Sequence, residues 1–314
     1  MLRVCLTAAR NIDPPLWREW EHTRRTNPAL QSPFFAPEFS QIVGMVRNDV
    51  EVGVISRNGS VIAFFPFQRK QSEASHAVPI ADFMSECQGL ICNPNFECDP
   101  LELIDRCGLV SYEFRQFIAS QKFFLRCPYH LDFSHQIDVS QGYVRWKRAS
   151  RLIRLSNDLA RRIECDFGPL RFVAHSHDPA LLRRVMDLKR DQDVRTGAQD
   201  HYGIAWVRSV IEKIHAIQSD DFAGVLSLLY AGDRLVAGHF GIRSRTVWHY
   251  WIPAYDPALA NYLPEMNLIL NMAKHGPTVG LRTIGFDSSR TLHKRKLSNG
   301  CIPLAKGKLY LRMG

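Results

Sequence analysis

Apolar positions in the first part of the chain recur with the period of helices at some places and of strands at others. Paired prolines suit the first turn of a helix over residues 14–28, and an Asn-Pro step suits its end. A second short helix is expected after Pro37. Two apolar runs flank Asn58-Gly59 and predict a β-hairpin over residues 50–67, because this dipeptide favours the tight turns that join antiparallel strands.

A long basic helix is expected to connect the two halves of the chain, over residues 140–165. Ser140 can accept hydrogen bonds from the first free amides of this helix, and Gly168-Pro169 cannot continue it. The segment carries a run of basic residues, which are Arg145, Lys147, Arg148, Arg151, Arg154, Arg161 and Arg162. Helical spacing spreads these charges around several faces, which is typical of a solvated helix.

The second half alternates between strands and helices, which indicates the α/β or the mixed α+β class. Its expected elements, in order, are a strand at 170–174, a helix that begins after Asp178-Pro179, a helix at 203–217, a hairpin at 224–240, a strand at 246–251, a loop at 253–263, a helix at 264–275 and a strand at 282–286. The second hairpin shares its glycine-containing turn with the first, and its Val236-Ala237 step corresponds to Ile62-Ala63. This similarity favours a duplicated domain.

The length of 314 residues favours two domains, since a domain typically has about 100–200 residues. We expect an N-terminal domain at residues 1–140 and a C-terminal domain at residues 141–314. Hydrophobic residues make up 46% and charged residues 23%, which is an ordinary globular composition. The net charge of +9 favours an anionic partner, such as a phosphorylated cofactor, nucleic acid, a polyanionic glycan or a membrane face.

Eight cysteines occur without a CxxC pair or the spacing of a zinc site, so we interpret them as reduced thiols and expect no metal. The densest group is Cys87, Cys92, Cys98 and Cys107, and free cysteines commonly behave as small buried apolar groups. The N-terminal apolar stretch is too short for a signal sequence, and no segment approaches a membrane span. These features predict a cytoplasmic protein.

Residues 248–275 form the first candidate for chemistry. A strand that leads through a loop to a helix leaves backbone amides unpaired at the helix N-terminus, and the helix dipole adds partial positive charge there. Such a site can hold a pyrophosphate. No GxSxG elbow, Walker loop or GxGxxG follows a strand, which disfavours hydrolases and nucleotide kinases. His175 and His177 lie two apart at a strand end, where exposure is favoured over metal binding.

Several short segments together resemble the acetyltransferase (GNAT) domain of CelD-type cellulose-biosynthesis proteins. In the second half these are AGHFG at 237–241, HYWIPAYDP at 249–257 and NYLP at 261–264. Further segments that resemble the family are GPLRF at 168–172, KRDQ at 189–192, RTG at 195–197, QSPFFAPEF at 31–39 and RNDV at 47–50. The resemblance covers nearly the whole chain, and its motifs are specific in combination.

The resemblance implies two tandem GNAT-like domains that face each other, as in the related peptidoglycan aminoacyl (Fem-type) transferases. It also implies acetyl-CoA or another acyl-CoA as the donor, and no metal. The cofactor-binding roles that it implies fall on Trp251, Ile252 and Pro253 for the pantetheine arm, and on Asn261, Tyr262 and Leu263 for the phosphates. Lys294 can pair with a phosphate or a carboxylate.

The chain departs from the family's pattern at two places. Where family members usually have Ser-Pro-Gly, it has Leu263-Pro264-Glu265, which brings a carboxylate near the proposed phosphates. A glutamate in the first helical turn is also what an unliganded helix favours. Where the family usually has Asp-Gly before Tyr-Lys, the chain has Asp287-Ser288-Ser289 and His293-Lys294.

Direct acyl transfer requires an acceptor nucleophile held beside the donor, a base for its proton and a donor group for the oxyanion. His239 and His249 lie on predicted strands, and either is a candidate base because histidine titrates near neutrality. Asp287, just beyond a strand end, is a comparable candidate. Tyr255 and Asp256 are the candidates for acceptor binding.

The sequence therefore predicts an acyl-CoA-dependent N- or O-acyltransferase. The resemblance alone places it in cellulose or other exopolysaccharide biosynthesis, with a small molecule or glycan precursor as acceptor. One alternative is a non-catalytic partner of the polysaccharide-synthesis machinery at the inner membrane face. Another is Fem-like aminoacyl transfer from charged tRNA, in which the basic helix contacts RNA; the main prediction needs no nucleic acid.

Overall fold

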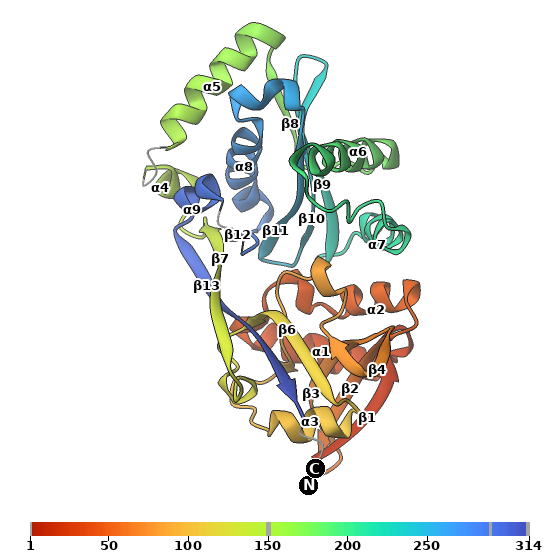
Figure 1. Ribbon diagram of the computed structural model, residues 1–314. Coiled ribbons are helices and arrows are strands. Elements are labelled where there is room, and N and C mark those ends of the chain that lie inside the picture. Colours follow the sequence, from red (N-terminus) through yellow and green to blue (C-terminus); the bar gives the residue numbers. More distant parts are fainter. Residues whose placement is uncertain (1, 149–151, 289–290, 312–314) are drawn as a thin grey trace. The chain divides into compact units, whose positions relative to one another are not determined.

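The computed structural model describes residues 2–148, 152–288 and 291–311, and its chain divides into two compact units (Figure 1). Unit 1 comprises the residues up to Ser134 together with those from Ile302 onward, and unit 2 comprises His135–Cys301. The C-terminal segment therefore belongs to the same unit as the N-terminus. The sequence pattern, which places the boundary at residue 140, contains no signal for this return.

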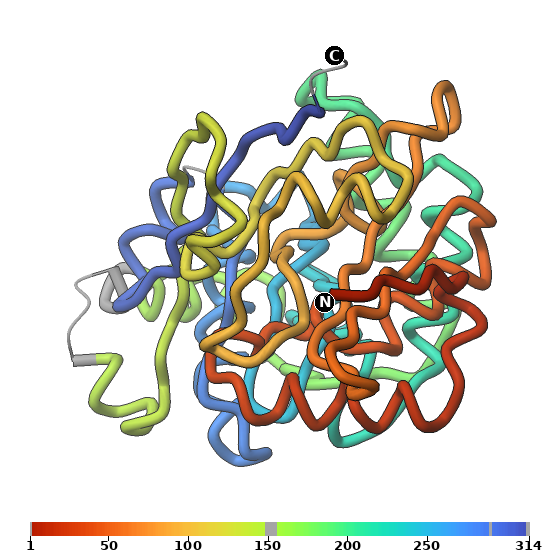
Figure 2. The backbone as a smooth tube through the Cα atoms, turned by 90° about the horizontal axis from the view of Figure 1, so that it is seen from below, coloured from red at the N-terminus to blue at the C-terminus, as the bar shows by residue number. Residues whose placement is uncertain are grey.

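Unit 1 is built on one mixed sheet. The strands, in their spatial order, are β1 (Leu2–Ala8), β2 (Val50–Arg57), β3 (Ser60–Lys70), β4 (Glu73–Val78), β6 (Ser111–Ile118) and β13 (Gly300–Tyr310), and the short β5 (Ile91–Cys92) pairs with β3. Figure 2 shows the C-terminal strand, in dark blue, running beside the chain of unit 1. It pairs antiparallel with β6, from Leu304 opposite Ile118 to Tyr310 opposite Ser111. The last strand of the chain thus completes the first unit.

The predicted hairpin of unit 1 is confirmed, and its two faces pack against different helices. Asn58 and Gly59 adopt φ angles of 52° and 84°, as the tight turn requires. Phe64 packs on Trp20 of helix α1 (Pro14–Thr26), with ring centroids 4.9 Å apart, beside α2 (Pro37–Val46). The next residue, Phe65, points to the other face, where it meets Tyr112 and the core under α3 (Pro100–Arg106).

The strands of unit 2 include one parallel pair. Its strands, in spatial order, are β7 (Tyr129–Asp138), β12 (Thr283–Gly285), β11 (Val247–Tyr255), β10 (Arg234–Arg243), β9 (Ala223–Ala231) and β8 (Leu170–Val173). The pair β11 and β12 is parallel, and the other neighbours are antiparallel. The predicted second hairpin, β9 to β10, is therefore confirmed.

Helices cover both faces of this sheet (Figure 1). Helices α6 (Pro179–Thr196) and α7 (Ala205–His215) pack on one face, and α5 (Leu152–Phe167) and α8 (Pro264–His275) pack on the other, with α4 (Tyr143–Arg148) and α9 (Leu292–Leu297) near its β7 side. Gly238 allows α6 to lie close to β10, because a Cβ there would be 2.4 Å from a methyl carbon of Val185. Ser156 donates a buried hydrogen bond to Asn267 and joins α5 to α8.

Two predictions about the second half are corrected. The helix expected over residues 140–165 begins later, at Tyr143, and its described residues belong to α4 and α5, with residues 149–151 outside the described residues; the amide of Ser140 donates to the carboxylate of Asp138. Of its basic run, Arg151 and the side chains of Arg148 and Arg154 lie outside the described residues. The loop expected from residue 253 begins only after Tyr255, and Pro257–Tyr262 forms a 3-10 helix, because Asp256 caps it by accepting from Ala258.

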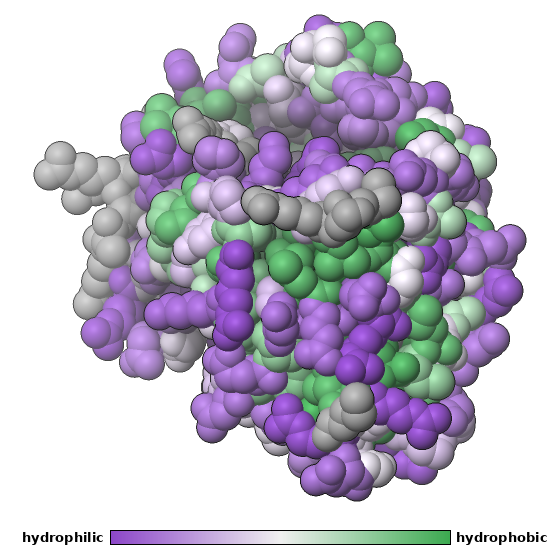
Figure 3. All heavy atoms as spheres, turned by 60° about the horizontal axis from the view of Figure 1, so that its bottom comes forward, coloured by the Kyte–Doolittle hydropathy of each residue, from purple (hydrophilic) through white to green (hydrophobic). Residues whose placement is uncertain are grey.

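The alternation of helices and strands confirms the mixed α/β class. Within the described ranges, no helix is both long enough and apolar enough to cross a membrane. Hydrophilic side chains predominate on the face that Figure 3 shows, with apolar atoms visible between them, which is ordinary for a folded domain.

Candidate functional site

Strand β11 has an open edge beside a parallel neighbour. Its residues Val247, Trp248 and His249 pair with β12, which ends at Gly285. Beyond this point β11 continues to Tyr255 with β10 on one side, and no described strand pairs with its other side. An extended ligand can therefore lie along this edge, as the resemblance implies for a pantetheine arm.

The opposite edge of β11 contains a bulge that a histidine side chain fills. The register between β10 and β11 shifts between Phe240 and Ile242. Gly241 lies there, where a Cβ would be 2.3 Å from the carbonyl oxygen of His249 and 2.4 Å from the ring of His239. The Nε2 atom of His239 accepts from the amide of Trp251 at 3.1 Å, so an imidazole takes the place of a strand carbonyl.

His239 is therefore a structural group and a poor base. Its side chain is fully buried, and its ring stacks on Tyr250 with centroids 4.5 Å apart. Burial, with a smaller contribution from neighbouring His249, lowers the pKa of His239 to about 3. Efficient general bases have pKa values near the working pH, and the pKa of this imidazole lies far below neutral pH.

His249, the other predicted base, does not share a face with His239. Trp248 and Tyr250 both belong to the core beneath α8, so the residue between them points to the opposite face of the sheet. His249 is 3% exposed. The structure thus directs the two imidazoles to opposite faces of the sheet and buries both.

Asp287 and Lys294 are brought together around Tyr250. The ammonium of Lys294 lies 3.2 Å from the Asp287 carboxylate and 5.5 Å from the centre of the Tyr250 ring. Lys294 is 7% exposed, so this ion pair is largely removed from water. Burial, and then the negative charge of Glu265, raises the pKa of Tyr250 well above its usual value. Sequence reasoning missed Tyr250, although strand alternation would have placed it on the same face as Trp248.

A pocket of about 210 Å³ lies at the start of α8. Its walls include Tyr255, Leu263, Pro264, Glu265, Met266 and His293. Leu263, just before the helix, has the left-handed φ of 47°, and its side chain does not cap the helix. Of the predicted substrate-binding and cofactor-binding residues, Tyr255 and Leu263 thus lie at this pocket.

The turn into α8 has few amides left for a ligand. Leu263 donates to the carbonyl of Ala260, and Met266 and Asn267 donate to that of Leu263. Pro264 has no amide hydrogen. Within residues 263–267, only the Glu265 amide has no acceptor in the turn.

Glu265 puts an ionised carboxylate into the same pocket. Its Oε1 atom lies 3.6 Å from Nε2 of His293. Burial by itself would raise the pKa of the Glu265 carboxyl, but His293 and the positive charge of Lys294 hold this pKa below its usual value. The pocket therefore carries negative charge where the resemblance implies a diphosphate.

The other predicted site residues have mainly structural contacts. Tyr262 donates to a carboxylate oxygen of Asp166 on α5 at 2.5 Å, and Asn261 is exposed. The carboxylate of Asp256 caps the 3-10 helix and also accepts from Arg234. Trp251 and Ile252 are buried, and Pro253 is half-buried. The predicted acceptor contact through Asp256 thus competes with its bond to Arg234.

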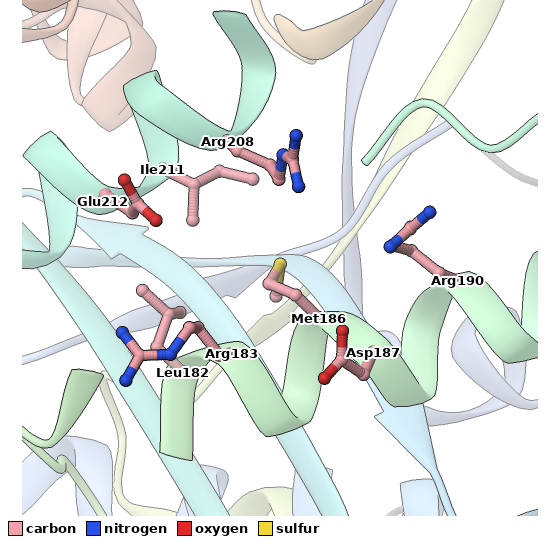
Figure 4. Close-up of a pocket in the computed structure, with 8 residues that line it drawn as sticks. All are labelled: Leu182, Arg183, Met186, Asp187, Arg190, Arg208, Ile211 and Glu212. Carbon is pink, nitrogen blue, oxygen red and sulfur yellow. The ribbon is translucent and has the colours of Figure 1, made fainter. Parts of the chain in front are cut away.

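A second hollow, of about 150 Å³, lies between α6 and α7 (Figure 4). Leu182, Met186 and Ile211 form its apolar part, and Figure 4 shows the last two facing each other between the helices. Charges of both signs surround it, among them Arg208 and Glu212 of α7. This mixture gives the hollow no clear preference for the charge of a ligand. Among the described residues, no group of three or more His, Cys, Asp or Glu is arranged to hold a metal ion.

Comparison with known proteins gives this geometry a class. Residues 154–294, which lie within unit 2, match the profile of the family described as "Acetyltransferase (GNAT) domain". A search of curated protein sequences found no match. Unit 2 thus contains a GNAT acetyltransferase-like domain.

Solved structures resemble the whole chain. FemX is 10% identical over 93% of this chain and 94% of its own, with a TM-score of 0.65. The C-terminal domain of a putative lysylphosphatidylglycerol synthetase from Agrobacterium fabrum is 9% identical over 92% and 90%, with a TM-score of 0.58. A tandem GNAT protein from the clavulanic acid biosynthesis pathway is 10% identical over 98% and 96%, with a TM-score of 0.51. The predicted fold of two tandem GNAT-like domains is therefore confirmed.

The GNAT fold generally implies acyl-CoA as a co-substrate, and the described residues fit this molecule only in part. The open edge of β11 suits an extended arm. The start of α8 does not suit a diphosphate, because three of its amides are already bonded and Glu265 contributes a like charge. The expected phosphate site at residues 261–263 is thus the weakest part of the fit.

Proposed function

We propose that unit 2 transfers an acyl group directly to a nitrogen or oxygen nucleophile. The supporting observation is that the open edge of β11 leads to a pocket at the start of α8, within the segment that matches a GNAT domain. Holding donor and acceptor together at one edge supplies proximity, which accounts for much of the catalysis of such reactions. No covalent enzyme intermediate is needed.

His293 receives the proton of the acceptor in this proposal. It lies in the wall of the pocket, next to a carboxylate that can orient its ring and stabilise its charged form. The buried His239 is committed to the amide of Trp251. The adjoining Lys294 is paired with Asp287, at 3.2 Å.

The donor and the pathway follow from the resemblance. Acyl-CoA is the proposed donor class, and the proposed acceptor is a small molecule or a precursor of cellulose or another exopolysaccharide. A cytoplasmic location, with the polysaccharide-synthesis machinery at the inner membrane face as partner, belongs to the same proposal. A non-catalytic chain would keep the fold and bind that machinery without transferring anything.

The test compares acetyl-CoA with acetyl-pantetheine, which lacks the diphosphate and nucleotide, as donors to a panel of amines and sugars. Because the start of α8 does not suit a diphosphate, we expect both donors to react with similar kcat/KM. A donor whose free concentration is 100 times its Kd raises the free energy of unfolding by about 2.7 kcal/mol. Transfer from neither donor, with no thermal stabilisation at millimolar concentration, would leave the non-catalytic alternative in place.

The same assay tests the proposed base. His293→Gln removes a titratable group, and we expect kcat to fall by about 10²–10⁴-fold, because general-base catalysis typically contributes that much. His22→Ala, on the exposed surface of α1, is the control and should keep full activity. An unchanged kcat for His293→Gln would assign the proton transfer to another group.

Aminoacyl transfer is the second candidate, and the Glu265 carboxylate favours it. A carboxylate at the pocket suits a donor without a diphosphate at that place, and FemX is among the similar structures. Charged tRNA as donor would contact the basic segment at residues 145–162, so its affinity should fall steeply with salt. Association with tRNA that does not change between low and high salt would exclude this candidate.

A further inference from the structure

The part of strand β7 that belongs to unit 1 exposes an apolar stripe. Tyr129, Leu131 and Phe133 alternate there with His130 and Asp132, and strand alternation places the first three on one face. Their exposed fractions are 42%, 56% and 46%. An edge strand with a row of large apolar side chains is a template for pairing with another chain, which monomeric proteins usually avoid.

The stripe continues the core face of the sheet. Ala305 and Leu309 of β13 belong to the core of unit 1, so Gly307 between them faces the same way. A Cβ at Gly307 would lie 2.8 Å from a ring carbon of Phe114 in that core and 3.2 Å from the Cβ of Tyr129. Tyr129 therefore starts beside the core, and the stripe extends this apolar face to the rim of the sheet.

The outer edge of β7 is open beside the stripe (Figure 1). Strand β13 lies on one side of β7, and β12, on the other side, pairs only with residues 136–138. The carbonyl of His135 accepts from Phe286, just after β12, so its backbone groups point to the β12 side. Backbone groups alternate in direction along a strand, so the same side receives those of every second residue before His135. No described strand meets them there. These residues are Tyr129, Leu131 and Phe133.

The segment is complementary to itself in antiparallel orientation. When two copies pair about Leu131, this residue faces its own counterpart, and Tyr129 faces Phe133 of the second copy. His130 then faces Asp132 of the second copy at a non-hydrogen-bonded pair, where the Cα atoms are only about 4.5 Å apart. Aromatic pairs and pairs of opposite charge are favourable across strands. Displacing the centre by one residue would place His130 or Asp132 opposite itself, so this register is preferred.

We propose that unit 1 pairs with a second copy of this chain through the open edge of β7, in antiparallel register about Leu131. The amide of Phe133 donates at 2.8 Å to the carboxylate of Asp132, which takes the place of a strand partner. On pairing, this amide bonds to a carbonyl of the second copy instead, and the released carboxylate meets His130 of that copy. The contact is short, so we expect reversible association at micromolar concentration.

Analytical ultracentrifugation of the full chain over a range of concentrations tests the surface. We expect the wild type to approach twice the monomer mass as its concentration rises. Leu131→Lys places like charges opposite each other at the centre of the contact and should weaken dimerisation at least about tenfold. Leu6→Lys is the matched control, because Leu6 is 39% exposed on β1, at the other edge of the sheet of unit 1, and it should dimerise as the wild type does. A wild type that stays monomeric, or a Leu131→Lys variant that dimerises equally well, would overturn the proposal.

Exchange of the charged pair tests the register. His130→Asp places carboxylates opposite each other twice in the dimer and should weaken dimerisation about tenfold. The double variant His130→Asp/Asp132→His restores both pairs of opposite charge, and its dimerisation constant should return to within about threefold of the wild-type value. A double variant that dimerises as weakly as His130→Asp would contradict pairing about Leu131.

Amide hydrogen exchange of the wild type provides a readout that does not depend on the folding of any variant. The amides of Tyr129 and Leu131 should exchange more slowly as the protein concentration rises, whereas those of β1 should not change. Dimerisation without slower exchange in β7 would assign the contact to another surface and overturn the proposal. Transfer activity is not measured in these experiments, so their failure leaves the proposed function intact.

Discussion

His239 illustrates how burial decides the role of a single side chain. On a predicted strand it is a candidate base, since a solvated imidazole titrates near neutrality. In the folded chain it has no exposed surface, and it accepts the amide of Trp251 at a bulge. His239 therefore has a structural role in the sheet. His293, which the sequence analysis notes only as a departure from the family pattern, lines the pocket.

Replacing His239 should destabilise the protein without a direct effect on the pocket. His239→Ala leaves the amide of Trp251 without its acceptor and opens a cavity beside Tyr250. We expect the free energy of unfolding to fall by about 2–4 kcal/mol near neutral pH, measured by urea denaturation. His22→Ala, on an exposed helix surface, should change it by less than about 0.5 kcal/mol.

The effect of His239 should also depend on pH. Its pKa is about 3 in the folded chain against 6.5 ordinarily, so the unfolded chain binds the additional proton between these values. The stability due to neutral His239 is complete above pH 6.5 and is lost as the pH falls toward 3. The wild type and His239→Ala should therefore converge on acidification. A constant difference in stability between them at all these pH values would contradict the assigned pKa.

At the scale of elements, local signals predicted most helices and hairpins of both units. Prolines at helix starts and Asn58-Gly59 act through the backbone of a few neighbouring residues, so the sequence reveals them directly. Helix α3 and strands β1, β4, β5, β6, β7 and β13 were not predicted, and for β1, β7 and β13 the partner strands lie far away in the chain. The connecting helix was expected from residue 140, whereas α4 begins at Tyr143.

The bulge between β10 and β11 requires glycine at position 241. A methyl group there would meet the backbone oxygen of His249 and the ring of His239, and neither can move without disturbing the strands. We expect Gly241→Ala to lower the free energy of unfolding by about 1–3 kcal/mol, measured by denaturant titration.

Gly276 provides the matched control for this substitution. Its φ of −47° suits any residue, and a Cβ there would lie 3.6 Å from Leu281, which is an ordinary contact. Gly276→Ala should therefore change the stability by less than about 0.5 kcal/mol. Equal stability of Gly241→Ala and Gly276→Ala would show that the bulge tolerates a side chain.

At the scale of the whole molecule, the chain's last strand belongs to its first unit. Leu304 and Leu309 of β13 are buried, at 0% and 1% exposure, in the sheet beside β6. Burial of a leucine contributes about 1.5–3 kcal/mol. Unit 1 therefore depends on a strand that begins at Gly300, although its other strands all end by Ile118.

Shortening the chain after Cys301 should therefore unfold unit 1 selectively. The loss of Leu304 and Leu309 removes about 3–6 kcal/mol of apolar burial and exposes the edge of β6. We expect the thermal transition of unit 1 to disappear, and a synthetic peptide of residues 302–314 to restore it. The fragment 135–301, which is unit 2, should keep its own transition. A shortened chain that unfolds as the full chain does would contradict this division.

The sequence by itself determined the mixed class, most elements of unit 2, the first two helices and the hairpin of unit 1, and the resemblance to a GNAT domain, because these depend on local periods, turn residues and short motifs. Tertiary structure decided which residues meet. It joined β13 to unit 1, buried His239 and His249, placed Asp287 against Lys294, and brought Glu265 and His293 into one pocket. These outcomes depend on burial and on contacts between distant segments, and the ionisation of each side chain follows from them.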